Sequence, residues 1–161
     1  MPRLLREGEP PRLACVQCGF VLYLNPKVAA AAVFCHDNGI ALVRRAIAPA
    51  VGKWVFPGGF VDLGETAPAA AIRETLEETG FKISLTGILD VYSFGANDVL
   101  VIVYAADIVG GAAQVGAECS ELGYFAPESL PWDELGFDST RAALRDYVRR
   151  FFPRVRAPRF A

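Results

Sequence analysis

The segment between Thr66 and Gly80 carries the signals of both ends of one helix. Thr66 is a favourable N-cap, and Pro68 falls in the first turn, where its missing N–H leaves no helical hydrogen bond unmade. Gly80 is the residue type most often found just past a last helical turn. We therefore predict a helix over residues 66–79.

The segments on either side of this helix predict a sheet. Apolar runs of strand length occupy residues 28–35, 40–46, 54–56, 88–94, 99–105 and 122–126. Asn38-Gly39 predicts a hairpin between the first two strands, and Pro57-Gly58-Gly59 predicts a turn or loop after the third.

A second helix is predicted over residues 139–152. Its apolar residues form one stripe, made of Leu144, Tyr147, Val148 and Phe151. Strands outnumber helices, and both helices can cover the same sheet. The sequence therefore predicts the α/β or α+β class, with a mixed β-sheet sandwiched between helices.

The first predicted helix places its acidic residues on one side. At about 100° per residue, Glu74, Glu77 and Glu78 share a face. The opposite face is apolar and is the predicted core stripe, made of Ala69, Ile72 and Leu76. Like charges at this spacing repel one another, and the helix dipole does not favour acids near its C-terminal end. The acidic face is therefore either a solvated charged surface or a site with a purpose other than helix stability.

A divalent cation would explain the acidic face. Magnesium is held in proteins by a few carboxylates together with water and substrate phosphate oxygens. Arg73 lies one turn before Glu77, where its guanidinium can hold a carboxylate in a fixed orientation. Glu65 adds a carboxylate just ahead of the helix, and Gly58 and Gly59 permit close backbone approaches.

Together these residues read Gly59-x5-Glu65-x7-Arg73-Glu74-Thr75-x-Glu77-Glu78-x-Gly80-Phe81. This pattern resembles the signature of the Nudix hydrolases, G-x5-E-x7-R-E-U-x-E-E-x-G-U, in which U is a bulky aliphatic residue. All fixed glycine, glutamate and arginine positions match, whereas Thr75 is polar and Phe81 is aromatic at two U positions. Further stretches resemble Nudix proteins with an N-terminal zinc ribbon, at residues 25–28, 42–45, 52–54 and 130–132.

The resemblance implies Mg2+-dependent hydrolysis of a nucleoside diphosphate linked to another moiety, with Mn2+ as an alternative cofactor. It implies metal ligands at Glu65, Glu74, Glu77 and Glu78. Gly58 and Gly59 would let the backbone meet the diphosphate, and Arg73 would orient a carboxylate rather than react. The general base is either a glutamate of the motif or an acid on a later loop. The candidates are Glu77, Glu78, Glu118 and Glu121, and a solvated loop acid is the alternative interpretation of the last two.

Residues that touch substrate are less clearly marked. Arg45 either contacts phosphate or is an exposed residue of the sheet. Strand alternation turns Arg44 to the opposite face. Tyr92 and Phe94 share a strand face, where they either stack on a base or pack in the core.

ADP-ribose or a similar nucleotide sugar is the first substrate candidate. Residues 92–95 do not match the SQPWPFPxS motif of NADH pyrophosphatases, so NADH is a less favoured substrate candidate than ADP-ribose. The alternative function is a Nudix-fold sensor or regulatory module that binds a nucleotide sugar without cleaving it. The intact glutamates of the motif favour turnover.

Cys15-x2-Cys18-Gly19 has the form of one zinc knuckle. Related proteins place a second cysteine pair before it, and no cysteine precedes Cys15 in this sequence. We therefore expect no structural zinc at Cys15 and Cys18. The predicted division is an N-terminal extension with an incomplete knuckle over residues 1–24, a Nudix hydrolase domain over residues 25–153 and a basic tail over residues 154–161.

Charge and composition narrow the classes of partner. A net charge of −2 argues against nucleic-acid binding, and the arginines of residues 141–159 are expected to form a solvated helix face. No apolar run is long enough to span a membrane. The few, unevenly placed cysteines indicate a reducing, cytoplasmic location. The family resemblance allows a homodimer, but the sequence locates no interface.

Overall fold

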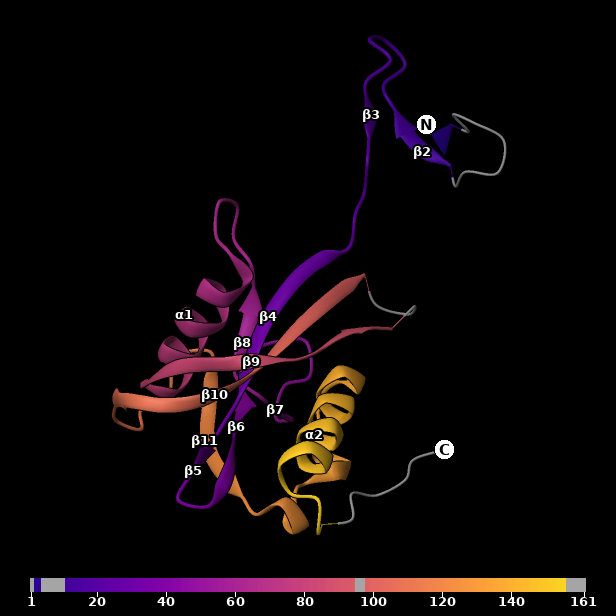
Figure 1. Cartoon of the computed structure of the whole chain (residues 1–161). Coiled ribbons are helices and arrows are strands. Elements are labelled where there is room, and N and C mark those ends of the chain that lie inside the picture. The colour runs from indigo at the N-terminus through magenta and orange to yellow at the C-terminus, as the bar shows by residue number, and fades with distance from the viewer. Residues whose placement is uncertain (1, 4–10, 95–97, 156–161) are drawn as a thin grey trace.

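A mixed four-stranded sheet forms the centre of the computed structural model, which describes residues 2–3, 11–94 and 98–155 (Figure 1). The strand order is β8-β4-β10-β9, and the strands are β4 (Lys27–Val33), β8 (Gly58–Phe60), β9 (Phe81–Ser93) and β10 (Val99–Gly111). β10 runs parallel to β4 and antiparallel to β9, while β8 is antiparallel to β4. The strands predicted at residues 88–94 and 99–105 are confirmed and extend further than predicted.

A second sheet has the order β11-β6-β5, with β7 paired to β6. Its strands are β5 (Cys35–His36), β6 (Gly39–Arg45), β7 (Trp54–Val55) and β11 (Cys119–Phe125). The predicted hairpin is confirmed, but its turn lies one residue earlier than Asn38-Gly39. Asp37 and Asn38 take φ values of 48° and 64°, and Gly39 begins β6. Asp and Asn tolerate this left-handed conformation better than other non-glycine residues, so glycine is not needed in the turn.

Helix α1 (Ala67–Thr79) has the ends that the sequence predicts. The Thr66 hydroxyl oxygen accepts a hydrogen bond from the Ala69 N–H at 3.3 Å. Gly80 takes a φ of 75°, and its N–H donates to the Leu76 carbonyl at 2.9 Å. The two caps satisfy backbone groups that a helix end would otherwise leave without partners.

The central sheet lies between two helices. Side chains alternate along β4, so that Ala30 packs with Ala70 and Ala71 of α1, while Ala31 and Val33 face the opposite cluster. That cluster includes Leu144 and other residues of α2 (Asp138–Phe151), which contacts β9 and β10. Figure 1 shows the two helices on the two sides of the sheet. The predicted α+β class, with a mixed sheet between helices, is confirmed.

The predicted core stripe of α1 was wrong. Ala69 is exposed, and the side chains of Ile72 and Leu76 are 39% and 41% exposed. The buried residues lie on the other side of the helix and are Ala70, Ala71, Thr75, Glu78 and Thr79. Small side chains let this face approach the alanines of β4 closely, which the bulkier Ile72 and Leu76 would prevent. The Thr75 and Thr79 hydroxyls donate to helix carbonyls at 2.7 and 2.6 Å, so they are buried with partners.

The prediction of a turn or loop at Pro57-Gly58-Gly59 was also wrong for its glycines. Gly58 and Gly59 belong to β8 and pair with Ala31 and Ala30 of β4. A Cβ on Gly58 would lie 2.6 Å from the Ala31 Cα and the Ala30 oxygen. The neighbouring strand therefore leaves no room for a side chain at this position.

Helix α2 begins one residue before the predicted start, and most of its predicted stripe is buried. Leu144 and Val148 are fully buried and Tyr147 nearly so, but Phe151 is 44% exposed at the last turn. Two 3₁₀ turns, η1 (Pro127–Ser129) and η2 (Trp132–Glu134), connect β11 to α2.

Matched leucine truncations test the faces assigned to the two helices. We expect Leu144→Ala to lower the free energy of unfolding by about 2–5 kcal/mol, because it opens a cavity in the fully buried core. Leu76→Ala should lower it by less than about 1 kcal/mol, because that side chain is already half in water. Urea unfolding of both variants measures the difference. Equal losses would contradict the assignment.

The N-terminal strands form a separate small sheet, in the order β1 (Pro2–Arg3), β2 (Arg12–Ala14) and β3 (Val21–Leu22). It lies apart from the helix-covered sheet in Figure 1. Cys15 and Cys18 lie in the exposed turn between β2 and β3. Parts of the predicted extension and tail, residues 1, 4–10 and 156–161, and Gly95 lie outside the described residues. None of the helices in the described part of the chain combines the length and apolarity needed to cross a bilayer.

Candidate active site

The acidic face of α1 packs toward β8. The Gly58 N–H donates to the Glu78 carboxylate at 2.9 Å, which fixes the last turn of the helix against the start of the strand. Glu74 lies against Gly59, where an added Cβ would collide with its carboxylate. The two glycines thus allow a strand backbone to approach two carboxylates directly.

Burial and mutual repulsion disfavour the charged forms of these two carboxylates. The pKa of Glu78 is raised to about 7, chiefly by burial and to a lesser extent by the charges of Glu74 and Glu118, while the Gly58 N–H and Arg45 act in the opposite direction. Burial also raises the pKa of Glu74, and the charges of Glu77 and Glu118 add to that shift against Arg73. A cation placed among them would relieve both the burial penalty and the repulsion. The donor set, which consists of carboxylate oxygens, suits a hard divalent cation.

Arg73 connects the carboxylates to one another. Its Nε and Nη2 atoms donate to the two oxygens of Glu65, each at 2.9 Å. Its Nη1 donates to Glu74 at 2.7 Å and to Glu77 at 3.4 Å, and Nη2 also reaches the Phe60 carbonyl at 3.2 Å. The hydrogen bonds from Arg73 lower the pKa of Glu65. Arg73 therefore fixes the orientation of one carboxylate in the loop before α1 and of two carboxylates in α1.

Arg73→Lys should keep the positive charge but lose the paired hydrogen bonds to Glu65, because an ammonium cannot reproduce the planar fork of a guanidinium. We expect kcat/KM to fall about 10–100-fold, with a thermal midpoint close to that of the wild type. Arg149→Lys is the matched control, because Arg149 is exposed and pairs only loosely with Asp146 at 3.6 Å. Unchanged kcat/KM in Arg73→Lys would show that the paired geometry is not required.

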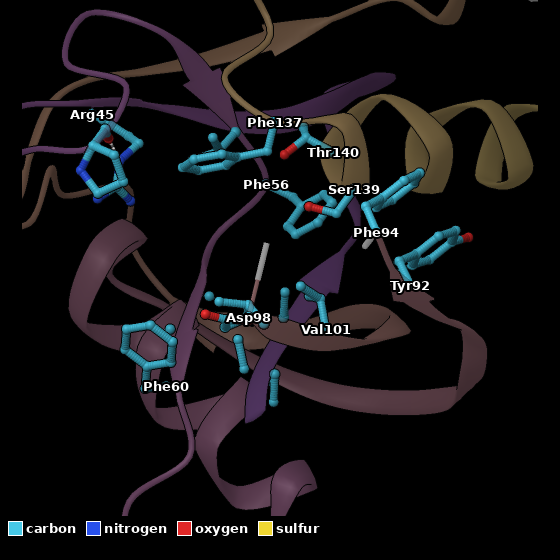
Figure 2. A pocket seen from close by; sticks show the side chains of 18 residues that line it. Arg45, Phe56, Phe60, Tyr92, Phe94, Asp98, Val101, Phe137, Ser139 and Thr140 are labelled. Carbon is cyan, nitrogen blue, oxygen red and sulfur yellow. Dashed lines mark hydrogen bonds between the residues drawn. The ribbon is translucent and has the colours of Figure 1, made fainter. Parts of the chain in front are cut away.

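A pocket of about 430 Å³ opens beside Gly58 and Gly59 (Figure 2). Aromatic side chains make much of its wall, namely Phe56, Phe60, Tyr92, Phe94 and Phe137. Arg45 lines it as well, with its Nε donating to the Pro49 carbonyl at 2.7 Å. Arg45 also lowers the pKa of Glu78, so it lies within electrostatic range of the acidic face. Gly58 and Gly59 line the pocket and also contact Glu78 and Glu74, so the pocket adjoins the acidic face.

Strand alternation separates the two neighbouring arginines as predicted. Arg44 lies 4.6 Å from the centre of the Trp54 ring and pairs with Glu121 at 3.0 Å. Glu121 is therefore turned toward Arg44, and it lies in β11 rather than in the predicted loop. Of the two later acids, Glu118 is the one whose charge reaches Glu74 and Glu78.

A sequence model of the NUDIX domain matches residues 25–151 of this chain. The chain belongs to the Nudix family. It is 38% identical over 132 residues to an ADP-ribose pyrophosphatase of Methanocaldococcus jannaschii, covering 80% of this chain and 76% of the relative. It is 39% identical over 116 residues to a putative 8-oxo-dGTP diphosphatase of Bacillus subtilis, covering 71% and 69%. A crystal structure of a NUDIX hydrolase from Nitrosomonas europaea superposes with a TM-score of 0.87 at 29% identity, covering 99% of this chain and 90% of that one.

These similarities make the protein a Nudix hydrolase, and Nudix hydrolases generally use a divalent metal. In the part of the chain that the structure describes, no three His, Cys, Asp or Glu side chains already form a metal-ligating group. Cys15 and Cys18, which are exposed, belong to no such group. The carboxylates of the acidic face form none either, and there Arg73 bonds Glu74 and Glu77. A cation at this face therefore requires side-chain rotation, for which the exposed Glu77 has the most freedom.

For the predicted aromatic pair, core packing is confirmed, and stacking on a base stays a prediction. Tyr92 and Phe94 pack against the core cluster and also line the pocket. The Tyr92 hydroxyl donates to Asp146 at 3.0 Å. Sequence reasoning missed the part of the wall formed by Phe137, Ser139 and Thr140 at the start of α2. No local pattern links these residues to Gly58, because only the packing of α2 on the sheet brings them together.

Proposed function

We propose that this Nudix hydrolase cleaves the diphosphate bridge of a nucleoside diphosphate linked to another moiety, with Mg2+ as its cation. The observation that carries the proposal is the contact of two carboxylates, the half-buried Glu74 and the buried Glu78, with the two glycines that line an aromatic-walled pocket. ADP-ribose or a similar nucleotide sugar is the first candidate substrate. The name of the Methanocaldococcus jannaschii relative, an ADP-ribose pyrophosphatase, supports this choice.

The proposed ligands of the cation are Glu65, Glu74, Glu77 and Glu78. When bound, the cation would neutralise charge on the diphosphate oxygens and lower the pKa of an attacking water. Arg73 is the positioning residue, because it contacts three of these carboxylates at once. Gly58 and Gly59 line the pocket, and their backbone is the proposed contact for the diphosphate.

Glu118 is our candidate for the group that accepts the proton of the attacking water. This choice is supported by the effect of its charge on both Glu74 and Glu78. Arg45 is the candidate for contact with phosphate, since it lines the pocket and its charge acts on Glu78. A cytoplasmic location and a homodimer stay predictions from the sequence.

The first experiment measures phosphate release, coupled to a phosphatase, from ADP-ribose, nucleotide sugars, NADH, diadenosine polyphosphates, coenzyme A and nucleoside triphosphates. Each substrate is assayed with Mg2+ and with EDTA, for the wild type and for Glu77→Gln. Because 58% of the Glu77 side chain is exposed, this variant should fold normally. Turnover that requires Mg2+ and disappears in Glu77→Gln would support the proposal. Nucleotide binding without turnover of any substrate would favour a sensor instead.

A further inference from the structure

One buried hydroxyl in the wall of the pocket has no hydrogen-bond partner. Thr140 is 1% exposed, and its Oγ1 atom is shielded from water and makes no hydrogen bond in the structure. Thr75 and Thr79 are equally buried, but both hydroxyls donate to carbonyls of α1. A buried polar group without a partner lowers stability, so it is an exception that needs an explanation.

The backbone around Thr140 adds further hydrogen-bonding capacity. Phe137 is the N-cap residue of α2, and its side chain gives no capping hydrogen bond. The Arg141 N–H bonds the Phe137 carbonyl at 3.1 Å, so the N–H groups of residues 138–140 precede the first hydrogen bond within the helix. Ser139 lines the pocket beside Thr140. The start of α2 therefore offers several neutral donors at one place.

The walls near Thr140 indicate which part of a ligand fits there. In Figure 2, Arg45 lies on one side of Phe137, and Thr140, Ser139, Phe94 and Tyr92 lie on the other. The guanidinium is thus at the end where a phosphate would bind. The other end presents aromatic rings and hydroxyls, which suit a planar, uncharged ring with hydrogen-bonding atoms along its edge.

We propose that the Thr140 hydroxyl hydrogen-bonds the base of the bound nucleotide and sets which base the enzyme prefers. This inference rests on the proposed function, because the nucleotide is the ligand that the function assigns to the pocket. A rotation of Thr140 about χ1, which is open to threonine in a helix, turns the hydroxyl toward the ligand. A base with a suitable edge then satisfies a group that has no partner in the free enzyme.

The test compares wild type, Thr140→Val and Thr140→Ser by calorimetric binding, in the presence of Mg2+. The probes are the α,β-methylene analogues of ADP, GDP and UDP, which carry a non-hydrolysable bridge, and methylenediphosphonate, which has no nucleoside. For the preferred base, Thr140→Val should raise Kd about five- to tenfold, the value of one hydrogen bond. Methylenediphosphonate and at least one other base should change less than about twofold. Thr140→Ser should retain the wild-type preference.

A stability measurement on the free protein separates a binding role from a structural one. Thr140→Val should raise the thermal midpoint by about 2–4 °C, because it removes a buried group that has no partner. Thr79→Val should lower the midpoint, because it removes a hydroxyl that has one. The combination of a more stable protein with weaker base binding is not expected of a purely structural threonine.

Several results would overturn the inference. A loss of equal size for all three nucleotide analogues would place the contact at the sugar, and a loss that includes methylenediphosphonate would make Thr140 structural. A lower thermal midpoint in Thr140→Val would show that the hydroxyl has a hydrogen-bond partner within the free protein. If the wild type binds none of the probes, the proposed function fails together with this inference. If it binds them and Thr140→Val binds them equally, only this inference fails.

Discussion

Glu78→Gln is expected to lower kcat about 100- to 1000-fold without unfolding the protein. Glutamine has the shape of glutamate, and its side-chain oxygen can still accept the hydrogen bond that the Gly58 N–H makes at 2.9 Å. The substitution removes an ionisable carboxyl group, whose pKa is raised by burial and by the charge of Glu74. A cation bound among these carboxylates would lose one charged ligand, while the packing of α1 on β8 would stay the same.

Single-turnover and steady-state rates at saturating Mg2+, together with a thermal midpoint, measure this effect. Glu134→Gln is the matched control, because Glu134 is exposed and contacts Arg44 at 3.5 Å, and neither residue lines the pocket. It should retain wild-type kcat. If Glu78→Gln turned over substrate within about threefold of the wild-type rate, Glu78 would have no direct role, and its burial would be a feature of packing alone.

Local signals in the sequence predicted the ends of α1 correctly. Thr66 and Gly80 act through hydrogen bonds to residues within one turn, so the chain itself contains all the partners that the prediction needs. The spacing of Glu74 and Glu78 likewise sets their common face for any straight helix. Such features can be predicted because they depend on sequence neighbours.

Features that depend on partners distant in sequence could not be predicted. The apolar pattern of α1 indicated that Ile72 and Leu76 face the core, but the sheet opposite it is rich in alanine and accepts only the small face of the helix. Glu78 is buried because β8 supplies an N–H for it. The position of Thr140 in the pocket depends on how α2 docks across β9 and β10, which no local pattern specifies.

Alanine substitutions at the two adjacent glycines of β8 are expected to have different effects, on stability at Gly58 and on kcat at Gly59. A Cβ on Gly58 would meet backbone atoms of β4, with the Ala30 oxygen at 2.6 Å, and a strand in the middle of a sheet cannot move aside. We expect Gly58→Ala to lower the free energy of unfolding by about 2–3 kcal/mol. A Cβ on Gly59 would instead meet the carboxylate of Glu74, the end of a flexible side chain.

Gly59→Ala should therefore fold with a loss of less than about 1 kcal/mol, but displace Glu74 from its position between Arg73 and the strand. A displacement of about 1 Å in a catalytic group can reduce the rate about 100-fold, so kcat should fall by about that factor. Urea unfolding and kcat, measured on both variants, separate the two effects. If Gly59→Ala instead lost stability and kept its rate, Glu74 would be a packing residue of α1. The proposed set of cation ligands would then have to exclude it, and Glu65, Glu77 and Glu78 would remain.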